Sequence, residues 1–117
     1  MKVLVIDIGG TFVKILATGQ KEPRSFPSGL SMTPRLMVAG VKKLAKDWEY
    51  GVVSIGYPGP VVNDRIVREP NNLGPGWIRF NFKAAFKRPV KVINDVAMQA
   101  LGSYRGGTML FLGEKPE

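Results

Sequence analysis

The stretch VLVIDIGGTFVKILATG, residues 3–19, decides the fold. Residues 3–7 form a short apolar run that ends in a carboxylate and is followed closely by two glycines, which predicts a buried strand. Residues 13–18 predict a second strand, and Gly9-Gly10 supplies a permissive backbone for the turn between them. The chain is therefore expected to open with a β-hairpin.

Downstream of the hairpin, strand and helix signals alternate. Residues 24–27 predict an edge strand because of their prolines. The pair Thr33-Pro34 starts an amphipathic helix whose apolar spacing continues to Trp48. The remaining signals are strands at 52–55, 90–93 and 109–112, a hairpin at 61–67 that turns at Asn63-Asp64, a short helix at 82–86, and a helix from Asp95 to about Tyr104. A meander followed by helix-separated strands predicts an α/β domain with a mixed sheet.

The composition limits the chemistry. A chain of 117 residues is enough for one domain, and its 44% hydrophobic and 22% charged residues are ordinary for a soluble protein. It has no cysteine and no histidine, so acid–base chemistry must fall to Asp, Glu, Lys or Tyr. No apolar run is long enough to span a membrane and no secretory signal is present, so we expect a cytoplasmic protein. The scattered basic residues, with a net charge of +8, favour a solvated surface over a polyanion-binding patch.

The segment Asp7-Ile8-Gly9-Gly10-Thr11, with Lys14 close behind, has the residue types of a phosphate site. Two glycines let the backbone approach a ligand, successive N–H groups can cradle phosphate oxygens, and Thr11 adds a hydroxyl. Asp7 could hold Mg²⁺ and Lys14 could offset phosphate charge. A plain β-hairpin with a Gly-Gly turn explains the segment equally well.

Asn94-Asp95 stands at a predicted strand-to-helix junction. A carboxylate there is favoured by the helix dipole and could accept a proton from a sugar hydroxyl during phosphoryl transfer, with Asn94 holding a neighbouring hydroxyl. The alternative is that Asp95 is simply the N-cap of the helix.

Two loops complete the set. The segment 56–61, Gly-Tyr-Pro-Gly-Pro-Val, is a stiff loop with few side chains at a strand end, where backbone groups can reach a polar ligand. The segment 70–77 combines Asn71 and Asn72 with Trp77, which suits a sugar because amides bond hydroxyls and a ring packs on C–H faces. Its alternative, a loop anchored by a buried tryptophan, is favoured when the segment is taken alone.

The order and rough spacing of segments 7–11, 56–61, 72–77 and 94–95 resemble those of ROK-type glucokinases, and look nearest to the bacterial members that include polyphosphate users. The resemblance implies a ribonuclease-H-like, actin/hexokinase-type domain that transfers a phosphoryl group from ATP or polyphosphate to glucose or a similar hexose with Mg²⁺. It also implies that Asp95 is the catalytic base. The phosphate site would be formed by Asp7, Gly9, Gly10 and Thr11, and the sugar contacts by Asn94, Gly59 and Asn72. The match is imperfect at Gly74, which is an extra residue before Pro75-Gly76-Trp77.

By this resemblance, residues 1–107 are expected to form the N-terminal half of a sugar kinase, and residues 108–117 the first strand of a missing second domain plus a polar tail. Half a cleft should bind sugar weakly and turn over slowly or not at all. The exposed strand at 109–112 would favour a homodimer. We expect neither nucleic acid nor a membrane as a partner.

Three alternatives stay open. An engineered or self-associating half-domain would need no catalysis. A sugar-sensing regulatory domain is disfavoured, because Asp7 lies too near the start for a preceding DNA-binding element. A ribonuclease-H-like nuclease could use Asp7, Glu69 and Asp95 as metal ligands, but it has no use for the Gly-Gly-Thr hairpin.

Overall fold

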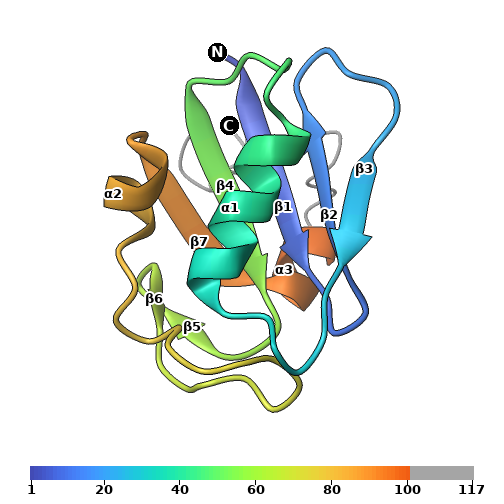
Figure 1. Ribbon diagram of the computed structural model, residues 1–117. Helices are drawn as coiled ribbons and strands as arrows, with labels where there is room; N and C mark the ends of the chain where they lie inside the picture. Colours follow the sequence, from blue (N-terminus) through green and yellow to red (C-terminus); the bar gives the residue numbers. More distant parts are fainter. Residues whose placement is uncertain (101–117) are drawn as a thin grey trace.

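The computed structural model describes residues 1–100 of the chain, and these form a mixed sheet with helices on both faces (Figure 1). The predicted strand at 109–112 and the end of the last predicted helix lie outside the described residues. The five strands of the main sheet are β1 (Val3–Ile8), β2 (Phe12–Ala17), β3 (Arg24–Pro27), β4 (Val52–Tyr57) and β7 (Val90–Asn94), in the order β3-β2-β1-β4-β7. The remaining elements are α1 (Pro34–Leu44), β5 (Val61–Val62), β6 (Arg65–Ile66), α2 (Phe82–Phe86) and α3 (Asp95–Ala100).

The strands follow the predicted meander. β2 pairs antiparallel with β1 and with β3, whereas β4 pairs parallel with β1 and β7 pairs parallel with β4. β1 and β4 are central, and nearly all of their residues are buried, which explains their continuous apolar runs. β2 instead alternates, with Val13, Ile15 and Ala17 buried. The expected α/β class with a mixed, ribonuclease-H-like sheet is confirmed.

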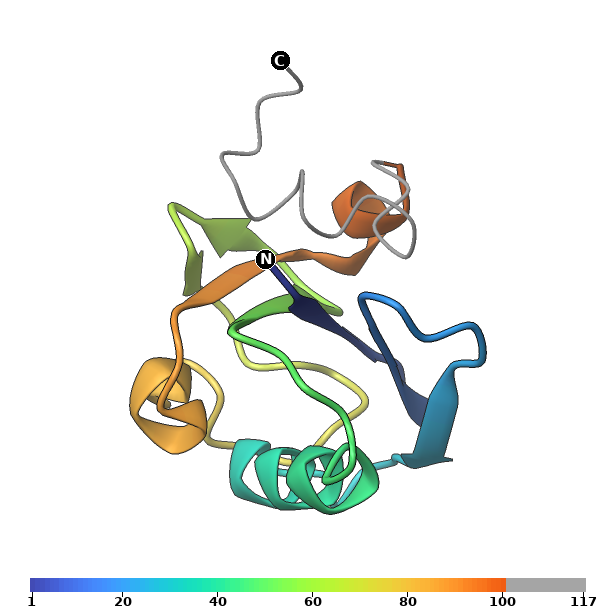
Figure 2. The same ribbon diagram turned by 90° about the horizontal axis from the view of Figure 1, so that it is seen from above.

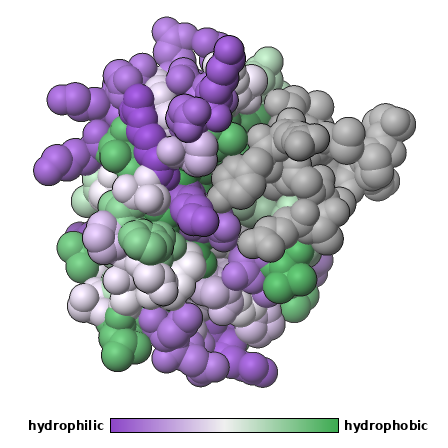
Figure 3. Space-filling model, turned by 90° about the vertical axis from the view of Figure 1, so that its right-hand side faces the viewer, coloured by the Kyte–Doolittle hydropathy of each residue, from purple (hydrophilic) through white to green (hydrophobic). Residues whose placement is uncertain are grey.

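The sheet has a large core on one face and a small one on the other. Seen from above, α1 and α2 cover one face and α3 lies over the opposite face (Figure 2). The large core packs Leu4, Ile6 and Ile8 of β1 against α1 and α2, and it includes the fully buried Trp77. The small one gathers Val3, Val5, Val52 and Met98 on the α3 face. Exposed large apolar side chains, such as Leu30 and Leu36, are scattered, and apolar residues form only separate patches in a space-filling view (Figure 3).

α1 begins as predicted and ends earlier. The Thr33 hydroxyl accepts a hydrogen bond from the Leu36 N–H, and Pro34 occupies the first turn. The apolar spacing predicted a helix up to Trp48, but the helix ends at Leu44. The Arg24 guanidinium donates to the Leu44 carbonyl at 2.8 Å, so a side chain of β3 satisfies a carbonyl of the last turn.

The small β5–β6 hairpin protects one edge of the sheet. Asn63 and Asp64 both have positive φ angles, of 50° and 68°, as a two-residue hairpin turn requires. The Asp64 carboxylate accepts a hydrogen bond from the Val92 N–H of β7. This bond occupies part of an edge that would otherwise be open to pairing with another strand. None of the helices in the described part of the chain has the length and hydrophobicity to cross a bilayer.

Candidate functional site

The carboxyl ends of β1, β4 and β7 meet at the lower edge of the sheet in Figure 1. In the parallel register Asp7 of β1 lies beside Gly56 of β4, and Gly56 lies beside Ile93 of β7. Parallel strands bring the segments that follow them to one edge, which is where open α/β sheets bind ligands. The predicted site segments therefore converge at this edge, which we call the carboxyl-end site.

The hairpin after β1 is held tightly by backbone contacts. The Gly9 N–H donates to the Phe12 carbonyl at 2.9 Å, and a Cβ on Gly9 would lie only 2.8 Å from that oxygen. A Cβ on Gly10 would lie 2.4 Å from the Asn72 amide nitrogen. The sequence suggested that these glycines supply a permissive backbone, but neither has a positive φ angle. Their shared requirement is space, because a side chain at either position would collide with its neighbours.

Asp7, Thr11 and Lys14 stand around this hairpin. Asp7 is directly opposite Lys14 in the β1–β2 register, so the two side chains share the α3 face of the sheet. Asp7 is half-buried, whereas Lys14 and Thr11 are exposed. The Thr11 carbonyl accepts a hydrogen bond from the Ser28 N–H at 2.8 Å, which ties the hairpin to the end of β3.

Asn94, and not Asp95, caps the third helix. The Asn94 Oδ1 accepts from the Val96 N–H at 3.0 Å, and its Nδ2 donates to the Gly59 carbonyl at 2.7 Å. The alternative interpretation of Asp95 as the N-cap is therefore wrong. The half-buried Asp95 carboxylate makes no hydrogen bond or ion pair with the residues that the structure describes. It lies in the first turn of α3, where the helix dipole favours a negative charge.

Gly56 was expected to begin the loop 56–61, but it lies within β4, which runs to Tyr57. A Cβ there would lie 2.5 Å from the Met98 Sδ and 3.5 Å from the Asp95 Cα. The missing side chain lets the first turn of α3 approach the sheet directly beside Asp7. A glycine within an otherwise apolar strand was the available signal, since such a glycine often marks a close backbone approach.

Trp77 anchors the loop that holds Asn72. The indole is fully buried, packs against Tyr57 and Phe82 with ring centroids 5.8 and 6.2 Å away, and donates from Nε1 to the Gly74 carbonyl at 2.7 Å. It therefore has no free face for a sugar, and the buried-tryptophan alternative is confirmed. The loop's own amide, Asn72, is exposed beside Gly10.

Glu69 organises the same loop from the other side. Its Oε1 accepts from the N–H groups of Gly76 and Trp77 at 3.1 and 3.0 Å, and its Oε2 accepts from the Ile78 N–H at 3.1 Å. The Tyr57 hydroxyl donates to the Arg68 carbonyl at 2.8 Å, and burial, followed by the Glu69 charge, raises the pKa of Tyr57. The first part of the loop is thereby fastened to the end of β4.

These bonds also disfavour the nuclease alternative. The Glu69 carboxylate is committed to three backbone N–H groups, so it is not available as a metal ligand. Among residues 1–100, no three acidic, histidine or cysteine side chains gather as a metal cluster.

The structure brings the predicted residues together at three places. At the first, Asp7 is the register neighbour of Gly56, and the backbone of Asp95 packs close to the same glycine. Asn72 reaches Gly10, and Asn94 holds Gly59. Lys14, on β2, lies opposite Asp7, and Thr11 lies in the hairpin between β1 and β2.

No protein-family model matches the chain, and no curated protein matches it significantly. Solved structures do match. The ROK hexokinase of Thermus thermophilus is 24% identical with a TM-score of 0.69, and 90% of this chain aligns with 39% of that one. A ROK family protein of Streptococcus pneumoniae, solved in complex with sucrose, is 20% identical with a TM-score of 0.63, and all of this chain aligns with 40% of that one. The chain thus spans about two fifths of the structures it matches, and over that length it has the fold of ROK-family sugar kinases.

Proposed function

We propose that this chain forms one wall of a sugar-kinase cleft, where a phosphoryl group passes from ATP or polyphosphate to glucose or a similar hexose. The observation that supports this most directly is that Asp7 and the first turn of α3, which carries Asp95, both lie beside Gly56. One carboxylate from a strand and one from a helix start, beside a glycine hairpin at the carboxyl edge of a sheet, suit a reaction that depends on positioning phosphate and hydroxyl groups.

Asp95 is the proposed catalytic base. Its carboxylate has no partner among the described residues, so it can accept the proton of a sugar hydroxyl as the phosphoryl group transfers. Asn94 and Gly59 are the proposed neighbours of the sugar. Asn94 has already committed one amide hydrogen and one oxygen lone pair, and it retains one of each for a hydroxyl.

The hairpin is the proposed phosphate site. Gly9 and Gly10 leave the backbone free of side chains, and Thr11 contributes an exposed hydroxyl. Lys14 lies on the same face as Asp7 and would offset phosphate charge. Asn72, whose amide lies beside Gly10, would be close to the same phosphate ligand.

Mg²⁺ fits this donor set with Asp7 as its protein ligand. Magnesium in phosphate sites commonly rests on one or two carboxylates, with water and phosphate oxygens completing the shell. The half-buried Asp7 carboxylate, at the end of β1 and beside the hairpin, would supply the protein ligand of such a site. When bound, the ion would neutralise charge on the phosphate oxygens.

We expect the isolated chain to bind sugar weakly and to phosphorylate it slowly or not at all. The chain covers only about two fifths of the ROK-family structures. Phosphoryl transfer requires a site closed around the phosphates, so a second domain or a second copy of the chain would have to complete the cleft.

Amide chemical shifts of the ¹⁵N-labelled chain test this proposal. Titration with D-glucose should move amides in segments 56–60 and 94–98, and titration with ATP and Mg²⁺ should move amides in segment 8–14. Asp95→Asn should weaken the D-glucose response about fivefold or more, because a charged hydrogen bond is lost. Asp47→Asn, a carboxylate change on the exposed connection after α1, is the matched control and should leave the response unchanged.

L-glucose gives the contradicting outcome. If the two enantiomers shift the same amides to the same extent, no stereospecific sugar site exists at this edge. If D-glucose shifts only residues distant from Gly56, the sugar site lies elsewhere and Asp95 is not its base.

A further inference from the structure

A cavity lies at the opposite end of the sheet from the carboxyl-end site. It has a volume of about 490 Å³ and is formed by the end of α1, the connection 45–50 that leads into β4, and the segment 86–88 that leads into β7. It therefore sits at the amino ends of β4 and β7. We call it the amino-end pocket. Its size falls within the range of small-molecule sites.

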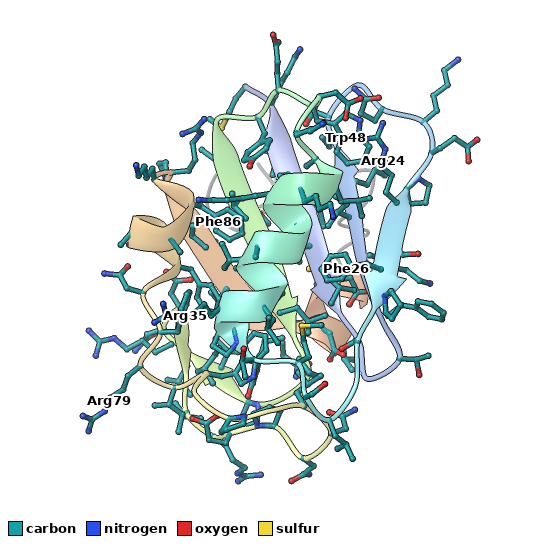
Figure 4. The ribbon with its side chains drawn as sticks, viewed as in Figure 1. Arg24, Phe26, Arg35, Trp48, Arg79 and Phe86 are labelled. Atoms are coloured by element: carbon teal, nitrogen blue, oxygen red, sulfur yellow. The ribbon has the colours of Figure 1, made fainter. Side chains whose placement is uncertain are left out.

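The pocket has an aromatic wall and a cationic rim. Trp48 and Phe86 are buried, Tyr50 is half-buried, and Figure 4 shows Trp48 and Phe86 near the upper end of the domain. Four exposed cations line it, namely Lys42, Lys46, Lys87 and Arg88.

Hydrogen-bond acceptors around the pocket are already occupied. Glu49 is its one acidic lining residue, and it pairs with Lys2 at 3.2 Å. The carbonyls of Tyr50 and Lys87 both accept from Arg88. The four exposed cations therefore give the pocket an excess of donors and positive charge.

Arg88 is held in place before any ligand arrives. Its Nε donates to the Tyr50 carbonyl at 3.2 Å, its Nη1 donates to the Lys87 carbonyl at 3.0 Å, and its guanidinium lies 5.6 Å from the centre of the Tyr50 ring. Fixing an arginine in this way lowers the entropy lost on binding an oxyanion. The Nη2 group makes no hydrogen bond within residues 1–100.

Lys87 adopts a conformation that normally belongs to glycine. It follows the end of α2 with φ 54°, in the left-handed region. Glycine adopts this conformation with no steric penalty at the end of a helix, whereas any other residue loses stability there. A lysine at this position therefore adds a cation to the rim at a cost in stability, as is common at functional positions.

We propose that the amino-end pocket binds a multiply charged phosphate anion, at a site separate from the carboxyl-end site. The cations supply the charge, the Nη2 group of the fixed Arg88 guanidinium supplies donors, and the volume accommodates several phosphate groups. The phosphates could belong to an inorganic oligophosphate or to a nucleotide, whose base would contact the wall at the half-buried Tyr50, since Trp48 and Phe86 are buried. The inference does not depend on the proposed kinase chemistry.

Calorimetric titration of the full chain with tripolyphosphate tests the proposal. We expect saturable binding that weakens with salt, because the contacts are ionic. Lys87→Gly and Arg88→Gln should each weaken it about fivefold to tenfold. Lys87→Gly should also fold at least as stably as the parent chain, since glycine relieves the left-handed backbone, so its loss of binding cannot be attributed to unfolding.

Three control variants decide whether the site is specific. Lys43→Gln removes an exposed cation from the same helical turn as Lys42, but Lys43 does not line the pocket. It should change the affinity less than twofold. If Lys43→Gln weakens binding as much as Lys87→Gly, affinity follows net charge alone and the proposal fails. If Lys14→Gln or Asp95→Asn changes it instead, the anion binds at the carboxyl-end site and the proposal also fails.

Titration with ATP distinguishes the two sources of phosphate. Equal affinity for ATP and tripolyphosphate, both lost in Lys87→Gly, supports recognition of the phosphate chain alone. Tighter ATP binding that is lost in the same variant supports a nucleotide whose base uses the aromatic wall. No saturable heat with either ligand at low salt overturns the site.

Discussion

The carboxyl-end site and the amino-end pocket are built from different materials. The first is shaped by backbone: glycines at 9, 10 and 56 pack where no Cβ fits, and Glu69 holds three N–H groups of one loop. The second is shaped by long exposed side chains around an aromatic wall. This difference predicts which substitutions the carboxyl-end site and the amino-end pocket can each tolerate. Changes of shape should damage the first, whereas changes of charge should alter the second without unfolding the domain.

Trp77→Ala should have the largest effect, because it removes the anchor of the loop at the carboxyl-end site. The ring is fully buried between Tyr57 and Phe82 and bonds the Gly74 carbonyl. We expect a loss of about 3–5 kcal/mol in the free energy of unfolding, measured by urea denaturation. The comparison at the other end is Phe86→Leu, a smaller change in a buried residue that lines the amino-end pocket.

The Trp77 prediction would be contradicted by a loss below about 1 kcal/mol, which is the level of an ordinary surface-proximal change. A loss for Phe86→Leu as large as that for Trp77→Ala would contradict the comparison itself. It would mean that the two ends depend equally on buried shape.

Gly9→Ala should destabilise the domain by about 1–3 kcal/mol, because its Cβ would lie 2.8 Å from a backbone oxygen that cannot move without opening the hairpin. Gly51→Ala is the matched control at the other end of the sheet. There an added Cβ meets only the Lys2 carbonyl, at 4.0 Å, and the φ angle is not positive. Thermal denaturation of both variants should therefore separate the two glycines.

A Gly51→Ala variant that loses as much stability as Gly9→Ala would show that backbone conformation, and not space, decides both positions. An unchanged Gly9→Ala variant would remove the argument that the hairpin is closely packed.

Local features of the fold could be predicted from the sequence. The Thr33 cap, the Asn63-Asp64 turn and the order of strands around the first hairpin depend on neighbouring residues, and all three are confirmed. The apolar run at 3–7 predicted a buried strand and the prolines of 24–27 predicted an edge strand, and both are confirmed.

Contacts between distant segments could not be predicted. The apolar spacing up to Trp48 overestimated α1, which ends at Leu44, where Arg24 from 20 positions away donates to the Leu44 carbonyl. Glu69 looked like a candidate metal ligand until its three backbone partners were seen. Asn94 and Asp95 are adjacent, and only the geometry assigns the cap to the first of them. In each case a tertiary contact settled what propensity left open.

Glu69→Gln should cost about 1–2 kcal/mol of stability, because an amide can replace only one of the two acceptor oxygens that hold Gly76, Trp77 and Ile78. Hydrogen exchange should show faster exchange at these three amides, whereas the amides of α1 keep their protection. Glu49→Gln is the control at the amino-end pocket, where an exposed ion pair is replaced. A loss for Glu49→Gln equal to that for Glu69→Gln would contradict the view that only the first end depends on backbone-binding carboxylates.

The smallest expected effect concerns acid sensitivity at the upper end of the domain. Arg24 donates to both Asp47 oxygens, at 2.6 and 3.1 Å, and its guanidinium lies 4.3 Å from the centre of the Trp48 ring (Figure 4). The hydrogen bond from Arg24 lowers the pKa of Asp47 below its ordinary value of 3.8. The unfolded chain therefore binds this proton first as the pH falls. The stabilising contribution of the ion pair is complete above about pH 4 and declines as the pH falls through the lowered pKa.

Denaturation between about pH 2 and pH 5 should show that Asp47→Asn loses less stability with falling pH than the parent chain. Glu22→Gln, a matched exposed carboxylate change, should follow the parent. If Asp47→Asn follows the parent chain as well, the ion pair contributes nothing to folding, and Arg24 acts at this end only through the Leu44 carbonyl and the Trp48 ring.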